Sequence, residues 1–490
     1  MNFTSITFLF FAFPAVIAIY FLIPAKRMKL RNVWLLVFSI LFYAWADIRG
    51  IIVILITVFL NWAAGLWLAR ASDAHIRKSI TGVCIVLNLL PLFLLKYASP
   101  FLQSTVGVEQ SGFLNTVLFL PLGISFYTLH AISYLIDIYR KKVPAQSNII
   151  NTALYILLFV KVVQGPIMKY SEFASQLLAR KTSLADVADG FCLFIIGLGK
   201  KILLSGNLAV IVSVAFSRPD AQLSVLFAWL GAYGYFLQMY YDFSGYSDMA
   251  IGIGRMFGFS MQRNFNYPYI ATSVSEYWQR WHITLGQWFR DYLYYPLALG
   301  PAIKIRRRLP AACSRHTGQL VSSGFSLFII WMCTGIWHGG TWNFVLWGMI
   351  NFVFIFWEAN RKPGSKSRFS AAIGWGYMIL IAFITKPLVY TATLAQAGSY
   401  YGAMLGLTGN ALWDANTLMY LRDYAVVLIA GSLLVFPIFE KPAKVLIGEN
   451  RKVLRICVGI VGVAVMVAIF SLSVAYILQN GFSPFIYQRY

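Results

Sequence analysis

Long apolar runs that carry few charges recur along the whole of this 490-residue sequence. A run of about 20 such residues crosses the roughly 30 Å hydrocarbon core of a bilayer as a helix. Backbone polar groups have no water to bind at that depth, so a spanning segment must be a helix or part of a closed barrel. Only 12% of the residues are charged, about half the fraction in soluble domains. The sequence therefore predicts an all-α polytopic membrane protein.

The candidate runs predict roughly 11–14 transmembrane helices, because some runs in the middle of the chain can merge. They centre on residues 5–24, 32–46, 51–69, 79–95, 113–136, 150–168, 187–204, 222–241, 319–338, 341–357, 370–385, 388–406, 424–439 and 456–478. No segment has the composition of a water-soluble domain, so we expect a single membrane domain over residues 1–490.

One stretch, from Tyr241 to Leu299, does not fit simple spanning helices. Its apolar runs are short and are interrupted by aspartates, arginines and aromatic residues. Irregular backbone at membrane depth must be buried in protein or line a cavity. We therefore predict re-entrant or interfacial amphipathic helices here. An ordinary cytoplasmic loop is the alternative.

The net charge of +23 is spread over short loops between the runs. Such loops orient a membrane protein because basic loops stay cytoplasmic, and they also meet anionic lipids. Nucleic acid is therefore not an expected partner. The basic segment Lys26–Arg31 follows the first run and Lys441–Arg455 precedes the last. Both termini are accordingly expected outside the cytoplasm, and the first run is expected to be a retained span.

An ionisable residue, His338, ends the apolar run "WMCTGIWHGG". Ionisable groups within membrane segments are costly and usually face a cavity. Histidine exchanges a proton near neutral pH, and the adjacent Gly339 and Gly340 permit close approach of a substrate or another backbone. A histidine packed at a helix end, with its polar atoms bound to a carbonyl, is the alternative.

A second histidine, His282, lies in "SEYWQRWHITLGQW" among aromatic and charged residues. Glu276 and Arg280 are four residues apart and can pair on a helix. The alternative interpretation is an interfacial amphipathic helix whose histidine snorkels to the membrane surface.

Upstream of this stretch, Asp242 and Asp248 have two serines between them. A metal site needs more oxygen ligands than these, so we expect buried carboxylates paired with arginines or backbone amides and no metal. The glycines at 252, 254 and 258 miss the dinucleotide-binding spacing and favour helix packing through small residues. The motifs of serine hydrolases, zinc proteases and P-loop ATPases are absent from the sequence.

Several long motifs, in this order along the chain, make it resemble the membrane-bound O-acyltransferase family, in its bacterial alginate and peptidoglycan O-acetyltransferase branch. The similarity covers about residues 5–360, with core motifs in 113–360, and is weakest over 361–490. The motifs are "PLGISFYTLHAISYLIDIYR" (121–140), "QGPIMKY" (164–170), "YDFSGYSDMAIGIG" (241–254), "NFNYPYIATSVSEYWQRWHITLGQWFRDYLYYPL" (264–297) and "GIWHGGTWNFVLWG" (335–348). Relatives often have a histidine where this chain has Asn351, and "PLGG" where it has "PLALG".

The resemblance implies a barrel-like helical bundle with a central tunnel. A donor would enter from the cytoplasm and an acceptor from the outer face. His338 would be the essential catalytic histidine. His282 would line the cytoplasmic side of the tunnel and is the second expected catalytic residue. Arginine makes bidentate contacts with phosphate, so Arg280 and Arg290 are candidates for binding an anionic donor. Trp278 and Tyr277 are expected to bind the donor with them. Structural or tunnel-forming roles are expected for Asp242, Asp248, Asn264 and Trp337.

We therefore expect transfer of an acyl group, most simply acetyl, from a cytoplasmic thioester such as acetyl-CoA to an extracytoplasmic acceptor. The product would be an O-acetylated envelope polysaccharide or exopolysaccharide: alginate, peptidoglycan or cellulose. No permanently bound cofactor is expected. The resemblance implies a bacterial inner-membrane location and a separate extracytoplasmic acetyltransferase or polysaccharide-modifying partner. The alternatives are D-alanyl transfer to teichoic acid and a non-enzymatic transporter or export scaffold.

Overall fold

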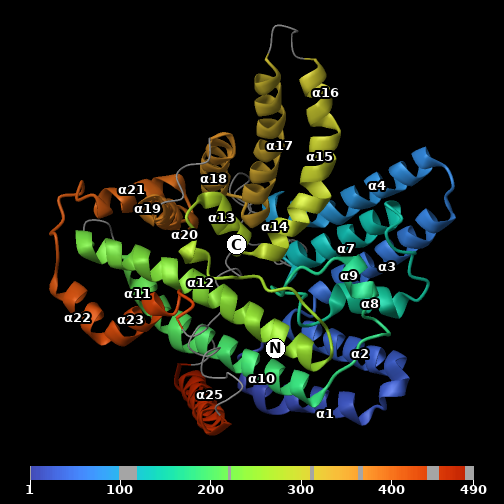
Figure 1. Ribbon diagram of the computed structural model, residues 1–490, viewed down its shortest axis with the longest axis horizontal. Coiled ribbons are helices and arrows are strands. Elements are labelled where there is room, and N and C mark those ends of the chain that lie inside the picture. Colours follow the sequence, from blue (N-terminus) through green and yellow to red (C-terminus); the bar gives the residue numbers. More distant parts are fainter. Residues whose placement is uncertain are drawn as a thin grey trace, which may run out of the picture. The chain divides into compact units, whose positions relative to one another are not determined.

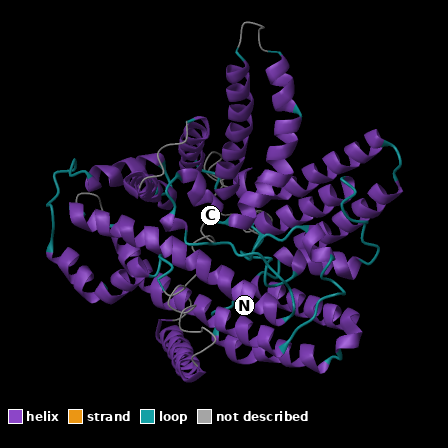
Figure 2. Ribbon diagram, viewed as in Figure 1, coloured by secondary structure: helices purple, strands orange, loops and turns teal. Residues whose placement is uncertain are grey.

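A computed structural model describes residues 2–98, 119–218, 222–308, 314–361, 368–438 and 452–480. Within these ranges the chain forms helices joined by loops, and no strand (Figure 2). In this described part of the chain, seven helices are long and apolar enough to cross a membrane: Ala25–Ala46, Gly50–Arg70, Ala74–Tyr97, Thr317–His338, Trp342–Asn360, Phe369–Tyr390 and Val458–Gln479. The prediction of an all-α polytopic membrane protein is thereby confirmed.

The other candidate runs form helices that are shorter or interrupted or, in one 32-residue helix, less apolar. Within the described ranges, seven helices are therefore long and apolar enough to span a membrane, whereas 11–14 transmembrane helices were expected. The start of the run 113–136 and most of the basic segment 441–455 lie outside the described residues.

The chain divides into two compact units, Met1–Phe194 with Ser247–Gln262, and Ile195–Tyr246 with Arg263–Tyr490. Helices α10 (Leu184–Gly199) and α12 (Val225–Met256) contribute residues to both. The expectation of a single membrane domain over residues 1–490 stays a prediction.

The first unit is built around α7, which packs on α3 and α4 (Figure 1). Arg77 of α4 donates to the carbonyls of Ile138 and Tyr139 at the end of α7, where a cation stabilises the helix dipole. The amides of Asn61 and Asn88 pair across α3 and α4. The helices of this unit are α1 (Phe13–Leu22), α2 (Met28–Ala46), α3 (Gly50–Arg70), α4 (Ala74–Phe93), α7 (Ile124–Tyr139), α8 (Ile149–Leu157) and α9 (Tyr170–Ala174).

The run 150–168, predicted as a membrane span, is helical only as far as Leu157. The next residues form an irregular segment that is buried throughout. Its polar backbone groups find partners in side chains: Phe159 N–H donates to the Ser39 hydroxyl at 3.1 Å, and the Tyr155 hydroxyl donates to the Met168 carbonyl at 2.9 Å. Apolar composition alone could not distinguish a spanning helix from irregular backbone buried in protein.

The predicted packing of α12 through glycine is confirmed within the first unit. A Cβ added to Gly190 of α10 would lie 2.5 Å from the carbonyl oxygen of Gly252 on α12. Only residues without a side chain allow backbones to approach this closely.

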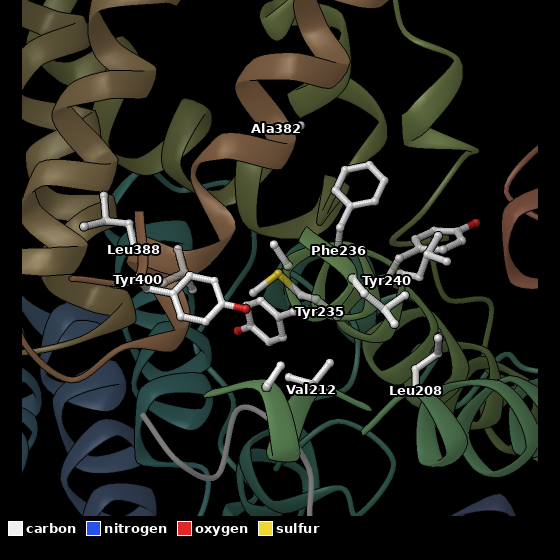
Figure 3. Packing of buried hydrophobic residues seen from close by; sticks show 14 of the residues in the cluster. Leu208, Val212, Tyr235, Phe236, Tyr240, Ala382, Leu388 and Tyr400 are labelled. Atoms are coloured by element: carbon white, nitrogen blue, oxygen red, sulfur yellow. The ribbon is translucent and has the colours of Figure 1, made fainter. Parts of the chain in front are cut away.

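The second unit has the middle of α12 at its core. Figure 3 shows Tyr235, Phe236 and Tyr240 of α12 facing residues of other helices, among them Leu208 and Val212 of α11. The Tyr400 hydroxyl donates to the Ala228 carbonyl at 2.9 Å, which ties α21 to α12. The helices of this unit are α11 (Gly206–Ser217), α13 (Val274–Arg280), α14 (Ile283–Phe289), α15 (Tyr295–Leu299), α16 (Pro301–Arg307), α17 (Arg315–His338), α18 (Trp342–Asn360), α19 (Arg368–Ile384), α20 (Lys386–Tyr390), α21 (Leu394–Met404), α22 (Ala415–Asp423), α23 (Ala425–Leu433) and α25 (Lys452–Asn480).

The stretch 241–299 combines one long helix end with several short helices. Contrary to expectation, α12 continues without a break through Asp242 to Met256, with Asp242, Ser244 and Ser247 buried against protein. The short helices from α13 onward agree with the prediction of interrupted, non-spanning structure.

Candidate active site

Helices α17 and α18 approach closely enough to place the end of α17 against the α18 side chains. A Cβ on Gly335 would lie 2.6 Å from the Phe344 carbonyl oxygen, and one on Gly348 would lie 2.5 Å from that of Trp331. Two glycines that face the partner backbone therefore bring the helices together. His338, the last residue of α17, is thereby packed beside Trp347.

The His338 ring is fixed by its own helix. Its Nδ1 lies 2.8 Å from the carbonyl oxygen of Thr334, four residues earlier. A carbonyl can only accept, so in the neutral imidazole Nδ1 carries the hydrogen and Nε2 carries the lone pair. The ring is 8% exposed and lies edge-on to Trp337 and Trp347, at centroid distances of 4.9 and 5.0 Å. This geometry agrees with parts of both interpretations of the sequence. The Thr334 carbonyl binds Nδ1, as expected for a histidine packed at a helix end. Nε2 remains basic, as proton exchange requires.

The glycines that follow His338 do not both provide room for a substrate. A Cβ on Gly339 would collide with the ring of Phe344. Gly339 is therefore required for packing against α18, which corrects the expectation that it opens space for a ligand.

His282 occupies the break between α13 and α14. Its backbone is left-handed, with φ 45° and ψ 50°, a conformation that costs energy for a residue with a Cβ. The side chain is 2% exposed, and its ring lies edge-on to Phe243 at 4.7 Å. A snorkelling interfacial histidine would reach solvent, so the structure excludes that interpretation.

Asn264 organises the turn around His282. Its Oδ1 accepts from the backbone N–H of Thr284 at 3.2 Å and from the hydroxyl of that residue at 2.6 Å. His282 Nδ1 lies 3.4 Å from the same oxygen, so this nitrogen is again the donor and Nε2 carries the lone pair. Asn264 thus binds the start of α14 and the histidine together, consistent with its expected structural role.

Burial keeps His282 neutral. Loss of hydration lowers the pKa of His282 well below its ordinary 6.5, and the nearby His338 lowers it further. A neutral imidazole with a lone pair on Nε2 can accept a proton or a hydrogen bond near neutral pH.

Each histidine borders its own cavity. His338 lines a small cavity of about 30 Å³, with Asn351 and Lys386. His282 lines a larger one of about 460 Å³, which is also bordered by Arg290 and Thr334.

Two tryptophans, Trp278 and Trp281, line both cavities and form the wall that they share. The Trp278 indole donates to Asn351 Oδ1 at 2.8 Å, which fixes its orientation. The Trp337 ring lies near both histidines, 6.4 Å from His282 and 4.9 Å from His338 between ring centroids. The two histidines therefore belong to one aromatic-lined region of the second unit.

The remaining predicted donor-binding residues separate into two groups. Arg290 lines the larger cavity, and its side chain is half-exposed beside Asp291. Arg280 lines neither cavity. It pairs with Glu276 at 2.9 Å, as expected from their spacing, and donates to the Asn266 carbonyl.

Tyr277 lines the small cavity and stacks on Trp281, with ring centroids 5.6 Å apart. It therefore borders the cavity of His338, whereas Trp278 borders both cavities.

Asp242 is buried on α12 and forms an ion pair with Lys201, and it also accepts from the Ser205 hydroxyl at 3.3 Å. The expected partner was an arginine or a backbone amide, and the actual one is a lysine 41 residues earlier in sequence. Asp248 lies further along α12 and is partly buried. Among the described residues, no group of three or more His, Cys, Asp or Glu side chains could hold a metal ion.

Sequence reasoning missed Lys386, which lines the small cavity together with His338. The signal was available, because Lys386 is an isolated cation in the apolar segment "ILIAFITKPLVY". The same criterion had singled out His338. Asn351 was noted only as a departure from relatives, and its contact with Trp278 places it in the wall of the site.

Known proteins are similar to this chain over most of its length. A model of the membrane-bound O-acyltransferase family matches residues 138–309. The chain is 34% identical over 430 residues to a probable alginate O-acetylase of Azotobacter vinelandii, covering 85% of this chain and 80% of that protein. A probable alginate O-acetylase of Pseudomonas aeruginosa is 34% identical over 424 residues, covering 85% of this chain and 77% of that protein. The peptidoglycan O-acetyltransferase of Helicobacter pylori is 28% identical over 442 residues, covering 84% and 81%.

Proposed function

Because the chain belongs to the membrane-bound O-acyltransferase family, we propose that it transfers an acetyl group from a cytoplasmic thioester to an extracytoplasmic hydroxyl. The product would be an O-acetylated polysaccharide of the cell envelope or an exopolysaccharide. Relatives named for alginate and for peptidoglycan acetylation support this substrate class.

The observation that carries the proposal is the His338 imidazole, which the Thr334 carbonyl holds through Nδ1 so that Nε2 carries the lone pair, at the edge of a buried cavity. A thioester already has a reactive carbonyl, so the main chemical need is to remove the proton of the acceptor hydroxyl. A correctly placed histidine base contributes about 10² to 10⁴ to such a rate. Alignment of both reactants in a protected site adds to this.

The reaction would proceed at Nε2 of His338. This nitrogen takes the hydroxyl proton as the acceptor oxygen bonds to the thioester carbon. The C–S bond then breaks, and the imidazolium returns the proton to the leaving thiolate. Direct attack of Nε2 on the thioester, which would give a transient acyl-histidine, is the second route for the same residue.

The donor would occupy the larger cavity, with its acyl end directed past Trp278 and Trp281 to His338. Arg290 at that cavity suits the phosphates of an anionic donor such as acetyl-CoA. His282, neutral and buried between the donor and the aromatic wall, would hold the thioester arm by a hydrogen bond to Nε2.

The chain is a multi-pass membrane protein, and we propose that it lies in a bacterial inner membrane with both termini outside the cytoplasm. The proposed reaction delivers the acetyl group to the outer face. A separate extracytoplasmic acetyltransferase or polysaccharide-modifying protein would complete the modification of the polymer.

The proposal is tested with the purified full chain in proteoliposomes, given labelled acetyl-CoA and oligosaccharides of alginate, peptidoglycan or cellulose. We expect acetyl esters on an oligosaccharide, or on an added extracytoplasmic partner, and none with His338→Ala. A D-alanyl thioester in parallel reactions distinguishes transfer to teichoic acid. Mass analysis of envelope polymers from cells with and without the chain identifies the acceptor. The proposal would be contradicted if His338→Ala left acetylation unchanged both in the proteoliposome reaction and in the polymers of cells that carry this variant.

A further inference from the structure

Lys386 is a cation in apolar surroundings. It begins α20 and is 5% exposed. Its Nζ lies 5.2 Å from the centre of the Trp281 ring and 5.9 Å from that of Phe236. Among the described residues, its hydrogen-bond contact is the thioether sulfur of Met239 at 3.5 Å, a weak acceptor.

No carboxylate pairs with Lys386 among the residues that the structure describes. This contrasts with Lys201, which is equally buried and pairs with Asp242. An ammonium group removed from water is costly unless an anion compensates it. Lys386 therefore lacks an anionic partner, and it lines the cavity of His338.

Three other polar side chains of this cavity already donate hydrogens to protein groups. The Thr385 hydroxyl donates to the Ile381 carbonyl, the Trp278 indole donates to Asn351, and the Asn351 amide donates to the Trp347 carbonyl. Lys386 has three N–H donors and no oxygen acceptor among the described residues. Its ammonium can therefore donate to an oxygen atom that enters this cavity.

We propose that Lys386 is the oxyanion-stabilising residue of the acyl transfer, with its ammonium donating to the carbonyl oxygen of the bound thioester. This inference rests on the proposed function. When the acceptor oxygen attacks the carbonyl carbon, the carbonyl π electrons move to oxygen, and Lys386 pairs with the negative charge. The acceptor proton goes to His338 Nε2. The charge collapses back as the C–S bond breaks, and the thiolate leaves with that proton.

The size of the cavity agrees with this role and with the acyl group. A volume of about 30 Å³ holds roughly two water molecules. A space of this size fits a small group such as acetyl. A charged donor in such a water-poor site has a strong effect, and loss of one oxyanion donor typically costs about 10² to 10³ in kcat.

Lys386→Met tests the inference, because methionine has a similar length and suits the apolar surroundings. Removal of an unpaired buried cation should leave the thermal midpoint unchanged or higher. We expect kcat with acetyl-CoA to fall by about 10² to 10³ while KM changes little. For Lys386→Gln, which keeps a neutral hydrogen-bond donor, kcat should fall less. Lys78→Met, which removes an exposed lysine of α4, is the charge-matched control and should retain full activity.

Two non-reactive donors separate oxyanion binding from a structural role. One is the trifluoromethyl ketone analogue of acetyl-CoA, which forms a tetrahedral oxygen species, and the other is S-ethyl-CoA, which has no carbonyl. The unmodified protein should bind the ketone far more tightly than the thioether. Lys386→Met should lose about 10² of this preference and bind the thioether as before.

An unchanged preference in Lys386→Met, with or without loss of kcat, would overturn the assignment, and so would full activity in that variant. Failure of the proposed function gives a different result. The unmodified protein would then neither transfer acetyl groups nor bind S-ethyl-CoA.

Discussion

His338 and His282 carry the same tautomer but owe it to different parts of the structure. His338 bonds to the carbonyl of Thr334, one turn earlier in its own helix. His282 lies beside the side chain of Asn264, 18 residues away, on a left-handed backbone between two short helices. A local hydrogen bond fixes the first ring, whereas a tertiary arrangement fixes the second.

This difference matches the cavities that the histidines border. His338 faces a space of about 30 Å³ with a buried cation, which suits a chemical step on a small group. His282 faces about 460 Å³ next to an arginine, which suits the binding of a larger molecule. The comparison suggests that His338 acts on the reacting atoms and His282 on the position of the donor.

The largest expected effect separates the two histidines directly. His338→Ala should lower kcat by about 10² to 10⁴, because the base is lost. His282→Ala should raise the donor KM and lower kcat by roughly tenfold, since a positioning contact is lost. Steady-state kinetics with acetyl-CoA in proteoliposomes measures both. Equal losses of kcat for the two variants would refute the division of roles.

Asn264→Ala should reduce kcat/KM by about tenfold, because the His282 ring and the start of α14 lose a shared acceptor. The unsatisfied N–H of Thr284 should also cost about 1–3 kcal/mol of stability. Asn264→Asp retains the acceptor oxygen and is the matched control. If the Ala variant were as active as the Asp variant, the His282 orientation would not depend on Asn264.

A smaller effect distinguishes the two arginines. Arg290→Gln should raise the KM for acetyl-CoA by roughly threefold, a modest change because the side chain is half-exposed. Arg280→Gln should leave this KM unchanged, since Arg280 pairs with Glu276 and lines neither cavity. Isothermal titration with CoA gives an independent measure. A larger effect at Arg280 than at Arg290 would reverse the assignment.

The smallest expected effect concerns how the stability of the folded state changes with pH. Burial lowers the pKa of His282 below its ordinary 6.5, so the unfolded chain takes up this proton before the folded protein does. The folded state therefore keeps its full stability above about pH 6.5 and loses stability as the pH falls below that value. His282→Gln should lose less stability than the unmodified protein between about pH 7.5 and about pH 5.5. Thermal midpoints in detergent test this, and parallel pH curves would contradict it.

Much of the fold followed from the sequence because apolar runs determine helices in a membrane. The runs at 51–69 and 341–357 became α3 and α18 with nearly the expected bounds. The run 150–168 failed, because burial inside protein permits irregular backbone as well as a helix. The polar stretch after Tyr241 departs from the expectation in the opposite direction, since α12 continues to Met256 with Asp242 buried and paired with Lys201.

The site could be predicted from the sequence where one ionisable residue stood in an apolar segment, because such a residue is energetically costly there. His338 and His282 stood out as ionisable groups among apolar ones, and both are buried at cavities. Lys386 carried the same signal and was overlooked. The sequence predicted less well those roles that depend on which residue lies nearby. Arg280 was expected to bind the donor, but it pairs with Glu276 and lines neither cavity. Asp242 was expected to pair with an arginine or a backbone amide, but it pairs with Lys201.

By itself the sequence determined a helical membrane chain, the positions of most helices and the two histidines worth attention. These follow from local properties, namely apolar length, helix periodicity and the cost of a polar group in an apolar run. Tertiary structure alone decided that Asn264 lies beside His282, that Lys386 and His338 border one cavity, and that Trp278 and Trp281 line both cavities. Such neighbours are separated by tens of residues, and the packing of whole helices, which no local pattern records, brings them together.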